Sequence, residues 1–217
     1  MFGDRLPLAE RYVGWLAGAG TIRGLIGPRE APRLWDRHVL NSAVVAEEID
    51  LSQSVADIGS GAGLPGMVLA IARPDLRLTL IEPLLRRTTF LQEVVEDLGL
   101  DNVAVVRGRA EDVARQHEFS HAFDVVTSRA VAALDKLADW SLPLVRDGGL
   151  FLPMKGESAE AELSTFRDAL TRRGCTDMEV CRVGTEVVEV PVTLIRMRVW
   201  ATRLERASRN RKRGKRG

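Results

Sequence analysis

The chain has 217 residues, of which 45% are hydrophobic and 28% are charged, and its formal net charge is +1. This composition predicts one soluble globular domain with a sizeable core. No apolar run reaches the ~18 residues that a membrane span needs, and the first residues lack the pattern of a secretion signal. Cys175 and Cys181 are too few for a disulfide scaffold and are poorly spaced for zinc. We therefore expect a cytoplasmic, monomeric protein without a membrane segment or a bound metal.

The first 50 residues predict a helical extension, because apolar side chains recur there at helical spacing. The first apolar stripe consists of Tyr12, Trp15, Leu16 and Ala19. After a Gly-Pro turn at 27 and 28, the second stripe runs through Leu34, His38, Ser42, Val45 and Ile49.

From residue 54 onward, short runs rich in β-branched residues alternate with helical stretches. The runs predict strands over 55–58, 77–82, 103–106, 123–127, 150–154, 178–183 and 193–200. Helices are predicted over 84–98, ended by Gly99, and through 163–170, ended by Gly174. This alternation indicates an α/β fold with a mostly parallel seven-stranded sheet. The last two strands lack a helix between them, which predicts an antiparallel edge.

The predicted organisation has three parts: a helical extension over 1–50, an α/β domain over 51–202 and a basic tail over 203–217. Residues 208–217 contain six basic side chains and no acid, so removing them changes the net charge from +1 to −5. Such a segment buries no apolar surface, and it is expected to be disordered when free and to attract polyanions. The residues of this tail that are candidates for contact with a polyanion are Arg209, Arg211, Lys212 and Arg213. The alternative is an incidental, solvated terminus.

A glycine-rich turn follows the first predicted strand. It begins after Asp57 and contains Gly59, Gly61, Gly63 and Gly66. A strand, a glycine turn and a helix in this order let a ligand approach the backbone at the carboxyl end of a parallel sheet. The alternative is a tight turn that binds nothing.

Two cofactors fit this turn. Gly61 to Gly66 match the G-x-G-x-x-G pattern of nicotinamide dinucleotide sites, and Glu82 follows about 20 residues later. Acids at the ends of three successive strands favour S-adenosylmethionine instead. Asp57 suits the cationic amino acid end, Glu82 suits the ribose hydroxyls, and Glu111 follows the third strand where an adenine would lie. Each acid has an ordinary alternative as a helix cap.

Further motifs extend the pattern beyond the turn. They are Arg37-His38-Val39-Leu40-Asn41-Ser42, Leu64-Pro65-Gly66, Thr127-Ser128-Arg129-Ala130 and Met154-Lys155-Gly156. Over roughly residues 6–200 the chain resembles the RsmG (GidB) family of bacterial methyltransferases. The resemblance implies a Rossmann-like class I methyltransferase fold, S-adenosylmethionine as cofactor, and methylation of guanine N7 in 16S rRNA at position 527 of the usual rRNA numbering. Asn41 departs from the family, which usually has aspartate at this position.

The resemblance also assigns residues to the donor site. Gly59 and Leu64 match donor-contacting positions, Ala110 and Glu111 match the pair beside the adenine, and Arg129 matches an arginine at the mouth of the pocket. We expect Arg129 to position the substrate; the alternative is an ion pair with Asp57 or Glu111. Guanine N7 carries a lone pair and no proton, so no general base is expected.

Three further residues are candidates for contact with the 16S rRNA or the small ribosomal subunit. His38 and Ser42 lie one helical turn apart and either form a wall of the site or tie the N-terminal helices to the sheet. Lys155 either contacts the RNA backbone or is solvated. Three other functions remain as alternatives. They are a nicotinamide-dependent oxidoreductase built on the same glycine-rich turn, a non-catalytic RNA-binding assembly factor and a small-molecule methyltransferase.

Overall fold

The computed structural model describes residues 1–27, 29–129 and 132–200. Its strands are β1 (Ser54–Ile58), β2 (Arg77–Glu82), β3 (Val103–Arg107), β4 (Phe123–Arg129), β5 (Val145–Lys155), β6 (Cys175–Val183) and β7 (Val192–Val199). They form one sheet in the order β3-β2-β1-β4-β5-β7-β6. The first five strands are parallel, and β7 is antiparallel to both β5 and β6. The predicted sheet and its antiparallel edge are confirmed.

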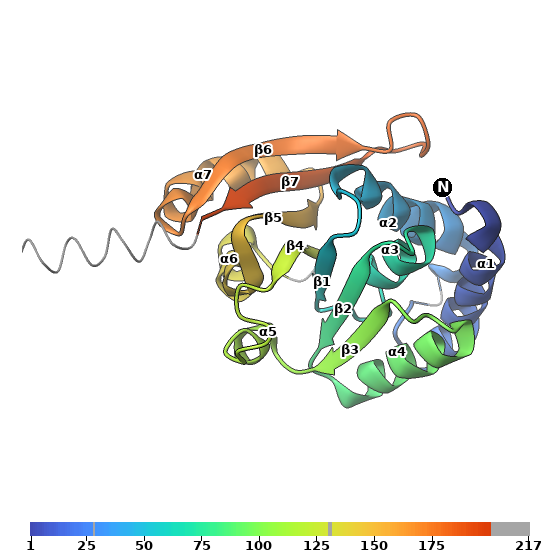
Figure 1. Ribbon diagram of the computed structural model, residues 1–217. Helices are drawn as coiled ribbons and strands as arrows, with labels where there is room; N and C mark the ends of the chain where they lie inside the picture. The colour runs from blue at the N-terminus through green and yellow to red at the C-terminus, as the bar shows by residue number, and fades with distance from the viewer. Residues whose placement is uncertain (28, 130–131, 201–217) are drawn as a thin grey trace, which may run out of the picture.

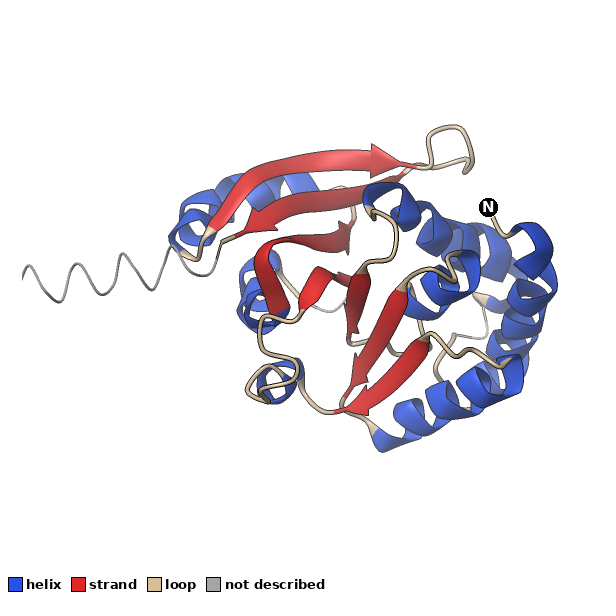
Figure 2. Cartoon of the chain, in the orientation of Figure 1, coloured by secondary structure: helices blue, strands red, loops and turns tan. Residues whose placement is uncertain are grey.

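Helices cover both faces of the sheet, as right-handed crossovers between parallel strands require (Figure 2). The helices are α1 (Leu6–Trp15), α2 (Asn41–Ala43), α3 (Gly66–Ala72), α4 (Leu85–Leu98), α5 (Ala110–Val113), α6 (Leu134–Ser141) and α7 (Ala159–Arg172). Short 3-10 or π-helical turns are η1 (Gly3–Arg5), η2 (Leu16–Gly20), η3 (Ala31–Arg33), η4 (Leu34–Leu40), η5 (Val44–Glu48) and η6 (Leu142–Leu144). The N-terminal helices, α3 and α4 share one apolar cluster, and α5, α6 and α7 pack in another.

The N-terminal segment packs directly on the α/β domain, where α1 lies beside α4 (Figure 1). Tyr12 is fully buried, and its hydroxyl donates a hydrogen bond of 2.7 Å to the carbonyl oxygen of Ala62. Trp15 packs edge-on against Phe90 of α4, with 5.9 Å between the ring centroids. Aromatic packing of this kind fixes the segment against the glycine-rich turn.

Strands β5 and β6 begin several residues before their predicted starts, because each continues past an irregularity in its pairing. β5 begins at Val145, and Gly148 has a φ of 74° close to a register shift in the pairing of β4 with β5. β6 begins at Cys175, and Asp177 has a φ of 48° at its own register shift. These residues are typical of turns, but a bulge lets the strand continue past them.

Candidate functional site

A cavity of about 740 Å³ opens at the carboxyl ends of the parallel strands. This is where doubly wound sheets bind ligands. Its wall consists of residues 58–62, 64, 81–84, 87 and 108–111, of Arg129 and Trp140, and of Leu25, Ile26 and His38 from the N-terminal segment. The structure therefore brings together most of the predicted donor-site residues, namely Gly59, Gly61, Leu64, Glu82, Ala110, Glu111 and Arg129.

The glycine-rich turn forms the floor of this cavity. Gly59, Gly61 and Gly63 have φ values of 66°, 59° and 102°, a region that other residues rarely adopt. Gly59 and Gly61 line the cavity, so backbone is exposed there to a ligand. Gly63 does not line it: a Cβ on this residue would lie 2.8 Å from Met67 Cβ and 2.9 Å from the Tyr12 hydroxyl. The prediction that Gly63 contacts the cofactor is therefore corrected, because this glycine serves the packing of α1 on the turn.

Asp57 is buried behind the turn and does not form part of the cavity wall. Its Oδ2 accepts a hydrogen bond of 3.0 Å from the Gly66 amide at the start of α3. Its Oδ1 has no hydrogen-bond partner among the described residues. Burial raises the pKa of this carboxyl from 3.8 to about 7. The predicted direct contact of Asp57 with a ligand is corrected: the carboxylate holds the turn against α3.

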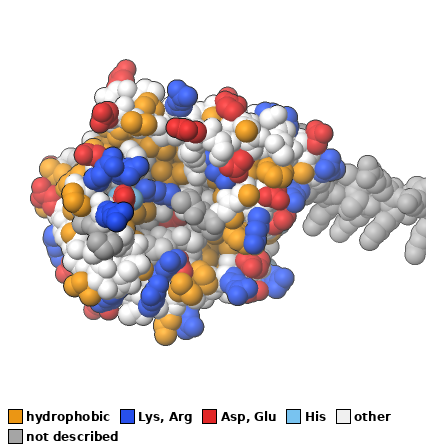
Figure 3. Space-filling view, turned by 180° about the vertical axis from the view of Figure 1, so that it is seen from behind, with side chains coloured by type: hydrophobic (Ala, Val, Ile, Leu, Met, Phe, Trp, Pro, Cys, Tyr) orange, Lys and Arg blue, Asp and Glu red, His pale blue; other side chains and the backbone are white. Residues whose placement is uncertain are grey.

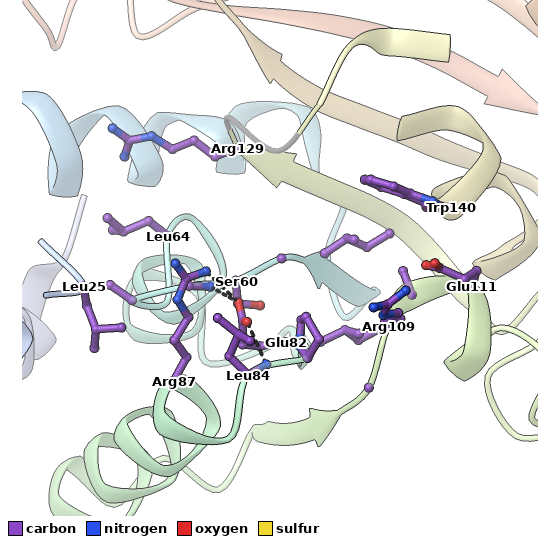
Figure 4. Close-up of a pocket in the computed structure, with 18 of the residues that line it drawn as sticks. Leu25, Ser60, Leu64, Glu82, Leu84, Arg87, Arg109, Glu111, Arg129 and Trp140 are labelled. Atoms are coloured by element: carbon purple, nitrogen blue, oxygen red, sulfur yellow. Dashed lines mark hydrogen bonds and ion pairs between the residues drawn. The ribbon is translucent and has the colours of Figure 1, made fainter. Parts of the chain in front are cut away.

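Glu82, at the end of β2, connects two segments of the cavity wall (Figure 4). Its Oε2 accepts the Gly61 amide at 3.0 Å, and its Oε1 accepts the Leu84 amide at 3.0 Å. Arg87, from α4, lies 3.5 Å from the same carboxylate. Each carboxylate oxygen accepts more than one hydrogen bond, so Glu82 retains acceptor capacity for hydroxyl groups of a ligand.

One end of the cavity suits a planar ring. Figure 4 shows Glu111, Arg109 and Trp140 together at this end, away from Leu64 and Arg129. Ala110 and Glu111 were predicted here, whereas Trp140 was not, because α6 lies about 30 residues further along the chain. An indole face offers a large apolar surface for stacking.

Arg129 ends β4 at the opposite end of the cavity and reaches over Leu64 toward the N-terminal segment (Figure 4). Its Nη2 donates to His38 Nδ1 at 2.8 Å and to the Arg37 carbonyl oxygen at 3.2 Å. Among the described residues it forms no ion pair with Asp57 or Glu111, so the geometry does not support a structural ion pair with either acid. Burial lowers the pKa of its guanidinium.

The predicted RNA contacts divide into three groups. His38 lines the cavity and also ties the N-terminal segment to β4, so both interpretations hold. Ser42 is fully buried and outside the cavity wall, which corrects its predicted contact with RNA. Lys155 donates to the Ala132 carbonyl and pairs with Glu162, each at 2.8 Å, so it is a structural tie and not a free RNA ligand. Arg209, Arg211, Lys212 and Arg213 lie outside the described residues.

Several wall residues were missed by sequence reasoning. Leu25 and Ile26 follow the first helical stripe but lie in a turn, where no periodicity points to a site. Arg87 lies in the first turn of α4, and its spacing of five residues from Glu82 is a weak local signal. Within the described ranges, no group of three or more His, Cys, Asp or Glu side chains is placed to hold a metal ion. None of the described helices has the length and apolar character needed to cross a bilayer.

The fold and site define a Rossmann-like methyltransferase architecture, and solved structures share this fold. A SAM dependent methyltransferase from Aquifex aeolicus superposes with a TM-score of 0.58 at 17% identity, covering 80% of this chain and 99% of that one. M. jannaschii TYW2 in complex with AdoMet gives a TM-score of 0.53 at 18% identity, covering 74% of this chain and 73% of that one.

Sequence comparison then gives the family. The GidB model, described as rRNA small subunit methyltransferase G, matches residues 5–189. Proteins called Ribosomal RNA small subunit methyltransferase G are 57% identical in Nocardioides sp., over 91% of this chain and 77% of that protein, and 56% identical in Mycolicibacterium smegmatis, over 90% and 82%. The chain belongs to this family, as its motifs predicted. The family excludes the nicotinamide-dependent oxidoreductase that the glycine pattern alone allowed.

Proposed function

We propose that this protein transfers a methyl group from S-adenosylmethionine to N7 of one guanine in 16S rRNA, at position 527 of the usual rRNA numbering. As a member of its family the protein is an rRNA methyltransferase that uses S-adenosylmethionine. The cavity at the glycine-rich turn is the observation that carries the proposal, because it joins the donor-site residues to the N-terminal segment. We propose that it works in the cytoplasm as a monomer.

The residues of the cavity fit S-adenosylmethionine along its length. Trp140 and Ala110 offer an apolar end for the adenine, and the buried Glu82 offers acceptors for the ribose hydroxyls. Gly59 and Gly61 present backbone in the cavity wall, and Arg129 offers a guanidinium that suits a carboxylate. A volume of about 740 Å³ lies within the usual range of small-molecule sites, ~300–1,000 Å³.

The bound donor supplies an electrophilic methyl group, and the chain supplies position and environment. Guanine N7 carries a lone pair in the plane of the ring and no proton, so no base has to remove one. The site agrees with this requirement, because His38 Nδ1 is already occupied by the Arg129 guanidinium. Leu25, Ile26 and Leu64 add apolar surface that excludes water beside the donor end.

The surface around the site supports an anionic partner. Figure 3 shows a hollow in the face opposite to that of Figure 1, with Lys and Arg side chains on both sides of it. Arg87, Arg109 and Arg129 all belong to the cavity wall. Arginine binds phosphates in a fork geometry and stacks on unpaired bases, the two contacts that an exposed guanosine offers.

Methyl transfer to small ribosomal subunits tests this function. Tritium from the labelled donor is expected in subunits that carry guanine at the target position. Subunits reconstituted with 7-deazaguanine there are expected to receive none, because that base lacks N7. Mass mapping of 16S rRNA from cells without the gene is expected to show the loss of one N7-methylguanosine. Persistence of every N7-methylguanosine would contradict the proposal.

A further inference from the structure

The Arg129 guanidinium is partly buried beside the cavity, and no described acidic residue forms an ion pair with it. Among the described residues it has two acceptors, the Arg37 carbonyl oxygen and His38 Nδ1, and neither carries a formal negative charge when the imidazole is neutral. Its Nη1 is buried and has no hydrogen-bond partner among the described residues. Burying an uncompensated charge and leaving a donor unpaired are both costly. The arginine is therefore prepared for an anionic oxygen that enters the cavity.

The contacts of His38 fix its protonation and its tautomer. A guanidinium only donates hydrogen bonds, so the Nδ1 that accepts from Arg129 carries no proton. The remaining proton is on Nε2, which lies 2.9 Å from Glu30 Oε2 and donates to it. A doubly protonated ring would turn an N–H toward Arg129 and break this contact.

The charged groups around His38 support the neutral ring. Arg129 and Arg37 disfavour its protonation, and Glu30 favours it. Burial, the largest effect, lowers the pKa of His38 below its usual 6.5. Glu30 also lies 3.6 Å from Arg37 and near the charge of Arg33, so its carboxylate sits among cationic side chains on the N-terminal side of the cavity.

We propose that Glu30 and His38 are positioning residues, a relay that fixes Arg129 as a binding site for an anionic oxygen in the cavity. This proposal rests on the proposed function. The anion is either the carboxylate of S-adenosylmethionine or a phosphate of the RNA strand, and both present the same chemistry to a guanidinium. The relay holds the arginine through neutral contacts, so its charge remains available for the ligand.

Calorimetric titration of the full chain with the donor, together with methyl-transfer kinetics on small subunits, distinguishes the two anions. Arg129→Gln removes a charged hydrogen bond, so the affected constant is expected to rise about ten- to hundredfold. If the donor carboxylate binds there, the dissociation constant of S-adenosylmethionine rises and that of its decarboxylated analogue does not. If a phosphate binds there, the KM for small subunits rises and donor affinity is unchanged. His38→Ala and Glu30→Ala are expected to raise the same constant that Arg129→Gln raises, each by about three- to tenfold.

A pH series separates the relay from a merely structural role. In the wild type, the constant that Arg129→Gln raises is expected to increase as pH falls, because His38 becomes protonated and its contact with Arg129 is lost. This increase is the acid limb of the pH series. His38→Asn, whose amide oxygen takes the place of Nδ1, is expected to restore most of the affinity and to lack this acid limb. Glu30→Gln keeps an acceptor for Nε2 and removes the charge that favours protonation, so its acid limb moves to lower pH. The wild type, His38→Asn and Glu30→Gln all retain Asp57, so the effect of its titration is common to all three pH profiles.

His117→Ala and Glu118→Ala, at exposed positions, are the matched controls. The proposal is overturned if His38→Ala and Glu30→Ala behave like these controls in both arms. It is also overturned if His38→Asn keeps the acid limb of the wild type, a result that remains readable if the alanine variants fail to fold. Failure of the wild type to methylate subunits would instead refute the proposed function, because the donor-binding arm needs no methyl transfer.

Discussion

Asp57 shows how one side chain holds the turn without forming part of the cavity wall. Its buried Oδ2 accepts the amide of Gly66, where a Cβ would lie 2.4 Å from Leu80 Cδ2 and 2.8 Å from that same Oδ2. Glycine is therefore required at position 66 by close packing. The carboxylate and the glycine together fix where α3 begins, and this places the backbone of Gly59 and Gly61 at the cavity.

The pKa of Asp57 predicts a pH-dependent stability at the residue scale. The folded value of about 7 lies above the unfolded value of 3.8, so the wild type loses stability as pH rises from about 4 to about 7. Asp57→Asn does not titrate, so its free energy of unfolding relative to the wild type is expected to increase across this range, by roughly 4 kcal/mol at most. Urea unfolding at several pH values measures the difference. Asp101→Asn, at an exposed position, serves as control, and a pH-independent difference for Asp57→Asn would refute the assignment.

At the scale of elements, α4 performs two tasks. Its first turn brings Arg87 to Glu82 at the cavity, and its apolar face packs on the N-terminal helices. It ends at Gly99, whose φ of 62° and hydrogen bonds to Glu96 and Val95 form a left-handed cap. The helix therefore connects the packing of the N-terminal segment with the wall of the site.

A pair of glycine substitutions tests this cap. Gly99 and Gly14 both have open space where a Cβ would be added, so neither substitution creates a clash. Gly99→Ala is expected to destabilise the protein by about 1 kcal/mol, because alanine is strained at positive φ. Gly14→Ala, in the exposed face of α1, is expected to stabilise it by about 0.5–1 kcal/mol through helix propensity. Thermal unfolding of both variants measures the difference, and equal effects would show that the cap contributes nothing.

At the scale of the whole molecule, the site is assembled from segments that are far apart in the chain. His38 of the N-terminal segment and Arg129 of β4 are 91 positions apart and meet at 2.8 Å. The body without residues 208–217 has a net charge of −5, so phosphate attraction depends on local arginines and on the tail.

Deleting residues 208–217 tests the contribution of the tail. If its six basic side chains contact phosphates, the affinity of the full chain for rRNA depends more strongly on salt than that of the deletion variant. The slope of log affinity against log salt concentration is expected to be steeper by about 4 to 5 in the full chain. The dissociation constant of S-adenosylmethionine is expected to stay the same. Filter binding at several salt concentrations measures the slope, and an unchanged slope would mean that the tail plays no part in RNA binding.

The sequence by itself determined the sheet, the glycine-rich turn and the family, because strand and helix periodicity and turn chemistry are local properties. It also placed Glu82, Glu111 and Arg129 at the site, since the carboxyl ends of parallel strands meet at one edge. The tertiary structure alone decided which polar side chains face the cavity. Asp57 and Ser42 are buried by the packing of the fold, and Lys155 forms an ion pair with Glu162. Glu30, His38 and Arg129 are connected by hydrogen bonds between segments that are distant in sequence. The burial and pairing of these side chains depend on how segments distant in sequence pack together. The spacing of residues along the sequence does not determine that packing.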